Sequence, residues 1–105
     1  MKLRVLPSAK QDLRRGYAFY ERAEQGIGAY FLDSLSSDLD SLRLFAGIHR
    51  RRGELFRFRS RRFPYWIYYR IEADKAYVVA VLDARRDPAR IAAREQREQR
   101  RTDAG

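Results

Sequence analysis

The hydrophobic pattern of this chain changes its period near Leu55, and this change constrains the fold more than any other feature of the sequence. Between Ile27 and Phe45 apolar residues recur every three or four positions, which is the spacing of one face of a helix. From Leu55 the period changes to two: residues 55–59 alternate between apolar residues and arginine, and the later segments are aromatic, β-branched or apolar, as strands are. The chain therefore has a helical half and a sheet-forming half, and each needs the other to bury its apolar surface.

The first half of the chain is expected to form one short strand followed by two helices. Residues 2–6 alternate weakly, and the fixed backbone of the proline that follows them suits the end of a strand. Ser8 and Gln11 have the spacing of a capping box, which predicts that the first helix begins there. Gly26 and Gly28 interrupt the helical pattern, so the helix with the apolar stripe should begin at this point.

The second half predicts three successive strands at residues 55–59, 64–71 and 76–82, which are aromatic, β-branched or apolar. Residues 72–75 form the turn between the last two strands, and connections this short favour an antiparallel meander. The expected fold class is therefore α+β with the order β-α-α-β-β-β. In it, a helical hairpin packs on one face of a small, mainly antiparallel sheet.

Alternation along these strands assigns their side chains to the two faces of the sheet. With Phe56 and Phe58 turned toward the helices, every second side chain points to the opposite face. That face should be open, aromatic and basic, because it carries Arg57, Arg59, Trp66, Tyr68 and Arg70. Exposed aromatic side chains beside arginines are typical anchors of interfaces, so we predict a partner-binding surface here.

The net charge of +9 is concentrated in two stretches of the chain. Residues 50–70 hold eight arginines and one acidic residue, and residues 85–105 also have an excess of arginine. Such a concentration attracts acidic partners, either nucleic acid or an acidic polypeptide. Arg85 and Arg86, directly after the last strand, complete the set of predicted binding residues, although a run of like charge is often only a solvated surface.

Several kinds of site are excluded by composition. The chain has no cysteine, which excludes disulfides, thiolate zinc sites and cysteine nucleophiles. Its one histidine, His49, has no companion ligands or triad partners, so we predict no metal site, no catalytic residue and no cofactor. The apolar run at residues 76–82 is far shorter than a membrane-spanning helix, and no export signal is visible. We therefore expect a cytoplasmic protein without a membrane partner.

The end of the chain differs in composition from the rest. Asp87 and Pro88 form a plausible helix start, but the residues that follow are polar and basic and have little to bury. We therefore predict one domain at residues 1–91, followed at residues 92–105 by a loose helix or a disordered tail. The last four residues are expected to be disordered.

Two segments of the second half resemble a known family. Residues 60–71, with the motif Phe63-Pro64-Tyr65, and residues 78–88, with the motif Arg85-Arg86-Asp87-Pro88, resemble the RelE/ParE superfamily of toxins from type II toxin–antitoxin systems. The first half agrees with this family through the pattern Ala9-x-x-Asp12-Leu13. The resemblance covers roughly residues 3–91, is closer to the ParE type, and implies the same helical hairpin on a small sheet.

The resemblance implies one of two activities. RelE-type members are ribosome-dependent mRNA endonucleases and need a tyrosine or histidine near the C-terminus as an acid or base. This chain has neither after Arg86, and Trp66 stands where RelE members place an arginine. ParE-type members inhibit DNA gyrase without nuclease chemistry, so the resemblance favours a toxin that binds an essential target over an enzyme.

The partner that the resemblance implies is a cognate antitoxin, through which the toxin would also oligomerise. We expect it to offer acidic side chains to Arg57, Arg59 and Arg70 and apolar ones to Trp66. Three alternatives stay open: a RelE-like mRNA endonuclease acting at the ribosome, a basic nucleic-acid-binding module, and a degenerate toxin that has kept only antitoxin binding.

Overall fold

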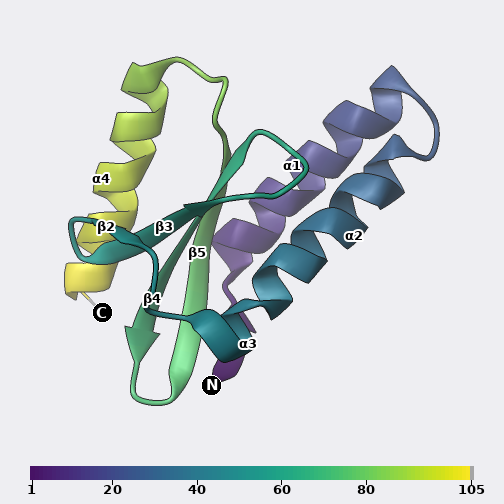
Figure 1. Ribbon diagram of the computed structural model, residues 1–105. Coiled ribbons are helices and arrows are strands. Elements are labelled where there is room, and N and C mark those ends of the chain that lie inside the picture. Colours follow the sequence, from purple (N-terminus) through teal and green to yellow (C-terminus); the bar gives the residue numbers. More distant parts are fainter. Residues whose placement is uncertain (105) are drawn as a thin grey trace.

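A computed structural model describes residues 1–104 of the chain, with the side chains of residues 1–102. After the first strand, the helices and the remaining strands follow one another in separate blocks, and a last helix ends this α+β arrangement (Figure 1). In chain order the elements are β1 (Lys2–Val5), α1 (Pro7–Ala23), α2 (Ile27–Asp40), α3 (Leu42–Phe45), β2 (Arg50–Arg52), β3 (Leu55–Arg59), β4 (Tyr65–Glu72), β5 (Lys75–Asp83) and α4 (Pro88–Ala104). The predicted fold class is confirmed.

The sheet has five strands in the order β1-β5-β4-β3-β2. The three predicted strands form the expected antiparallel meander, and β1 pairs in parallel with β5. Sequence analysis did not predict β2, because its three residues are all arginine and do not alternate. The register between β4 and β5 shifts at Tyr68 and Tyr69, which leaves Val79 as the extra residue of a β-bulge.

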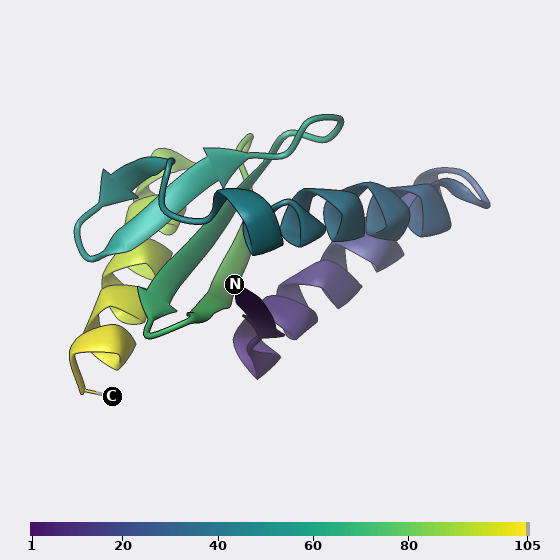
Figure 2. The same cartoon turned by 60° about the horizontal axis from the view of Figure 1, so that its bottom comes forward.

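The helices α1 and α2 form an antiparallel hairpin on one face of the sheet (Figures 1 and 2). They approach closely at Gly16, where a Cβ atom would clash with the ring of Phe31. The side chains predicted to face the helices do so, which confirms the register. The buried core on this side comprises Ala9, Phe31, Leu35, Leu39, Leu42, Phe56, Tyr65, Ile67, Tyr69, Ala76, Val78 and Val81.

Two local predictions about the helices were wrong. The predicted capping box at Ser8 and Gln11 does not form. The helix α1 begins two residues earlier, with Leu6 as its N-cap, and the Ser8 hydroxyl donates instead to the carbonyl oxygen of Val79, at 2.7 Å. The apolar stripe predicted one continuous helix, but the structure divides it into α2 and α3 at Ser41. The hydroxyl of Ser41 donates to the carbonyl oxygen of Asp38, at 2.6 Å, a bond that competes with regular helix geometry.

The helix α4 covers the face of the sheet opposite the hairpin (Figure 2). Its start is as predicted, since Pro88 is its first residue and the Asp87 carboxylate accepts the N–H of Ala89 at 3.0 Å. The expected disorder of residues 102–104 is wrong, because the helix continues to Ala104, whereas Gly105 lies outside the described residues. In the part of the chain that the structure describes, no helix has the length and hydropathy to cross a membrane.

Candidate interaction surfaces

The structure separates the seven predicted binding residues into three groups. Four lie together on β3 and β4, where Arg57 pairs with Tyr68 and Arg59 pairs with Trp66 across the two strands. We call these four residues the sheet-face cluster. Arg70 lies farther along β4, and Arg85 and Arg86 follow β5.

Within the sheet-face cluster, the arginines lie against the indole ring. The guanidinium carbon of Arg57 is 3.8 Å from the centroid of Trp66, and that of Arg59 is 5.3 Å away. Cation–π contacts of this kind are stronger where water is partly excluded, and here Trp66 is half-buried. These residues share one face of the sheet, as predicted, and the structure adds that the two arginines contact the indole ring.

The prediction that this face is open was wrong at Tyr68, because α4 covers it. Tyr68 is only 1% exposed, and its hydroxyl donates to Oε2 of Glu95 at 2.5 Å. The same carboxylate also pairs with Arg57 at 3.5 Å and with Arg52 at 3.3 Å. The fold therefore supplies within one chain an acidic side chain of the kind that we expected from a partner.

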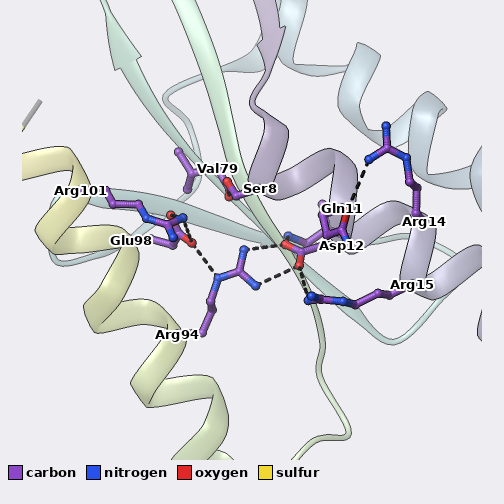
Figure 3. Close-up of polar contacts among 10 residues, drawn as sticks. Ser8, Gln11, Asp12, Arg14, Arg15, Val79, Arg94, Glu98 and Arg101 are labelled. Atoms are coloured by element: carbon purple, nitrogen blue, oxygen red, sulfur yellow. Dashed lines mark hydrogen bonds and ion pairs between the residues drawn. The ribbon is translucent and has the colours of Figure 1, made fainter.

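Glu95 and its partners form one polar centre beneath α4. A second polar centre, around Asp12, fixes α4 to α1 and β5 (Figure 3). Asp12 of α1 is 5% exposed, and its Oδ2 accepts the backbone N–H of Val81 at 2.9 Å. Arg94 of α4 donates to both oxygens of this carboxylate, at 2.9 and 2.8 Å, and also to Glu98 at 2.7 Å. A bidentate ion pair between arginine and a carboxylate is strongly directional, so it fixes the position of α4.

Of the three other predicted arginines, Arg70 and Arg85 are held by their own neighbours, whereas Arg86 is exposed and forms no side-chain ion pair among residues 1–102. Arg70 stacks over the ring of Tyr77 at 4.3 Å and pairs with Glu72 at 3.2 Å. Arg85 donates to both oxygens of Asp83 at 3.0 Å. Burial alone would raise the pKa of Asp83, but the hydrogen bonds from Arg85 outweigh it and hold that pKa below its ordinary value.

His49 has a packing role in the structure. Its Nδ1 lies 2.6 Å from the hydroxyl of Tyr69, which also accepts the N–H of Gly47 at 2.9 Å. The imidazole stacks on Phe58 with ring centroids 4.3 Å apart, and burial lowers the pKa of His49. Among residues 1–102, no group of three histidine, aspartate or glutamate side chains is placed to hold a metal ion.

The sequence matches the family described as "ParE toxin of type II toxin-antitoxin system, parDE" over residues 3–88. This chain belongs to the ParE toxin family. Among solved structures, it is similar to a chain of the "Chromosomal ParDE TA system from P. aeruginosa", with a TM-score of 0.73 and 16% identity, covering 79% of this chain and 95% of that one. No curated protein sequence matches it.

The family match of this ParE-family toxin does not extend along α4. It ends at residue 88, which is the first residue of α4. The residues that anchor α4, Arg94 and Glu95, therefore lie outside the matched region. The cover over the sheet-face cluster is a feature of this chain that the family match does not describe.

Sequence analysis missed the two polar centres of the toxin, although one left a signal. Asp12 lies between Ala9 and Gly16 at helical spacing, and small residues on the same helix face indicate a close approach of another element. A carboxylate on such a face needs a buried partner. Glu95 and Arg94 gave no comparable signal, because from Arg94 onward the sequence is polar and has no apolar periodicity.

Proposed function

We propose that this ParE-family toxin acts by binding DNA gyrase rather than by cleaving RNA, and that a cognate acidic antitoxin neutralises it. The resemblance to ParE-type toxins supports DNA gyrase as the target. The net charge of +9 supports an acidic antitoxin as the partner. DNA gyrase would be met in the cytoplasm, which is where we expect the protein to act.

The observation that carries the proposal is the state of the tyrosines on the sheet. Burial raises the pKa of Tyr68 to about 12, and burial likewise raises the pKa of Tyr65 to about 12. A general base for attack by a ribose 2′-hydroxyl must release its proton near neutral pH, and neither phenol does so. Arginine is always protonated and cannot take this role. These side chains are suited to recognition, so binding is the function that the geometry supports best.

The exposed part of the sheet-face cluster is the proposed contact with the target. Arg59 is exposed and Trp66 is half-buried, so a partner can reach both without moving α4. An aromatic ring flanked by arginines is a common anchor of protein interfaces. Tyr68, by contrast, is covered by Glu95 and is not accessible to a partner.

The test uses purified toxin with two assays in parallel. With DNA gyrase and plasmid DNA, we expect the toxin to trap cleaved DNA, while mRNA on translating ribosomes stays intact. Cleavage of the mRNA with no effect on gyrase would contradict the proposal and favour a RelE-like endonuclease. Failure in both assays would instead indicate a degenerate toxin or a simple nucleic-acid-binding module.

Two charge reversals of equal size locate the contact. Arg59→Glu lies in the sheet-face cluster, whereas Arg61→Glu lies in the exposed loop that follows β3. We expect Arg59→Glu to reduce gyrase trapping at least tenfold and Arg61→Glu to reduce it less than twofold. Equal losses in both variants would show that only overall charge matters.

Co-expression with an acidic protein encoded beside the toxin should restore growth if that protein is the antitoxin.

A further inference from the structure

A cleft of about 580 Å³ lies between α1, the end of β5 and the first half of α4. Its size falls within the range of sites for small ligands. Apolar side chains, among them Tyr65, Leu82 and Ile91, form part of its lining. The charged side chains that line it are five arginines and two aspartates: Arg15, Arg86, Arg90, Arg94, Arg97, Asp12 and Asp83.

The two carboxylates of the cleft are already neutralised by the fold. Arg94 contacts both oxygens of Asp12, and Arg85, from outside the cleft lining, contacts both oxygens of Asp83. Arg15 lies at a longer distance from Asp12, 3.8 Å. Both carboxylates are therefore engaged by arginines, and neither forms an ion pair with Arg86, Arg90 or Arg97.

Three arginines of the cleft have no such partner. Arg86, Arg90 and Arg97 form no ion pair with any side chain of residues 1–102. Arg90 and Arg97 lie seven residues apart on α4, with Arg94 between them on the same helix face. Like charges gathered on one wall repel each other, so the cleft is electrostatically complementary to an anion with more than one charge.

The backbone of β5 beside the cleft is closed to an added strand. Beyond the end of β1, the carbonyl oxygen of Val79 accepts the hydroxyl of Ser8, and the N–H of Val81 donates to Asp12. An extended peptide would therefore find these groups already satisfied, and recognition by main-chain pairing is blocked there. An occupant of the cleft must be recognised by its charge and by side-chain hydrogen bonds.

We propose that this cleft is a binding site for a phosphate-rich anion, either the phosphate chain of a nucleotide or successive phosphates of a nucleic acid strand. Guanidinium groups form paired hydrogen bonds with phosphate oxygens, and Arg86, Arg90 and Arg97 offer three of them around one cavity. Linked phosphates place several negative charges in this small volume. A polypeptide would need several acidic side chains in the same space, without help from the strand edge. The site is independent of the target proposed above.

The first test measures binding of pyrophosphate to the whole chain by calorimetry, with two variants of equal net charge. Arg90→Gln with Arg97→Gln removes two cleft arginines and keeps good helix formers on α4. Arg61→Gln with Arg62→Gln removes two exposed arginines that do not line the cleft. We expect the cleft variant to weaken pyrophosphate binding at least tenfold and the loop variant to weaken it less than twofold.

The outcome can overturn the proposal in three ways. No measurable binding to the unmodified chain, or equal weakening in both variants, would show that the cleft is not a site. A glutamate-rich peptide that binds in the cleft as tightly as pyrophosphate would replace a phosphate ligand with an acidic polypeptide. Circular dichroism of both variants checks that they are folded, and nuclear magnetic resonance signals of the Arg86 side chain report on the cleft directly.

A second set of titrations distinguishes the two sources of phosphate. A nucleoside triphosphate and a short single-stranded oligonucleotide are compared at the same salt concentration. Tighter binding of the triphosphate identifies a nucleotide site. Tighter binding of the oligonucleotide, with a steep loss of affinity as salt increases, identifies a contact with a nucleic acid backbone. Either result supports the site, provided that Arg90→Gln with Arg97→Gln abolishes the preference.

Discussion

The two faces of the sheet are covered by helices that are held in different ways. On the hairpin side, the core contains twelve buried apolar residues, and α2 contributes several of the largest. On the α4 side, the buried apolar cluster contains four residues, Leu55, Tyr68, Val79 and Ala80, and none belongs to α4. The hairpin is therefore held by hydrophobic burial, whereas α4 is held mainly by ion pairs and hydrogen bonds.

The polar attachment of α4 is spread along the helix. Arg94 contacts Asp12, and Glu95 contacts Tyr68. Farther along, Gln99 donates to the carbonyl oxygen of Arg52 and accepts the N–H of Glu54 at 3.0 Å. Polar contacts are directional and require matched partners, so few changes suffice to release such a helix. One small sheet can therefore pack one face through apolar side chains and the other through ion pairs and hydrogen bonds.

The largest effect is expected from Asp12→Asn, which keeps the shape of the side chain and removes its charge. The substitution leaves Arg94 without its main buried partner, and breaking a buried ion pair costs about 3–5 kcal/mol. Denaturant unfolding measures this loss, and hydrogen exchange should show faster opening of α4 than of α2. Asp33→Asn, exposed on α2, is the matched control. A loss below about 1 kcal/mol would mean that α4 is held in another way.

On the hairpin side, Leu35→Ala is expected to cost about 2–5 kcal/mol, because Leu35 is fully buried and its truncation leaves a cavity. Unlike Asp12→Asn, it should destabilise the whole domain without selective opening of α4. Leu44→Ala, at a position that is 83% exposed, should change the free energy of unfolding by less than about 0.5 kcal/mol. The comparison between the faces fails if Leu35→Ala releases α4 first.

A smaller effect is expected from Tyr68→Phe, which removes one hydrogen bond to Glu95 and leaves that carboxylate paired with two arginines. We expect a loss of about 1–2 kcal/mol, together with faster hydrogen exchange in α4. Tyr77→Phe is the control, since the Tyr77 hydroxyl has no hydrogen bond among the described side chains. Unchanged hydrogen exchange in α4 would show that Tyr68 does not help to hold this helix against the sheet.

The smallest effect concerns pH and His49 on the hairpin side. Because burial lowers the pKa of His49 in the folded state, the folded protein favours the neutral ring. Its contribution to stability is present above the ordinary value of about 6.5 and is lost as the pH falls below it. Unfolding of the unmodified chain and of His49→Gln, compared between pH 7.5 and 5.5, should show the smaller change for the variant. Identical pH profiles would contradict this assignment.

The sequence predicted the hairpin side well because hydrophobic periodicity is a local signal. The stripe from Ile27 to Phe45 predicted α2 and α3 together, and alternation placed Phe56, Ile67 and Tyr69 on the correct face. The break at Ser41 was missed because it depends on one side-chain hydrogen bond to the backbone rather than on the pattern of apolar residues.

The α4 side could be predicted only in part. Alternation correctly placed both Arg57 and Tyr68 on the face away from the hairpin, but it could not show what covers that face. The covering contacts join residues as far apart as Asp12 and Arg94, which are 82 positions apart in the sequence. A charged side chain in a polar helix gives no sign of its distant partner, so both the cover and the arginine-lined cleft required the structure.

The pairing of the first strand with the last has a consequence for synthesis of the toxin. Lys2 of β1 lies opposite Lys75 of β5, so the earliest strand to leave the ribosome must wait for the latest one. The hairpin can pack locally during translation, but the sheet cannot be completed until β5 has emerged. Chains that terminate before residue 75 therefore lack β5, the strand that pairs with both β1 and β4, and cannot complete the sheet.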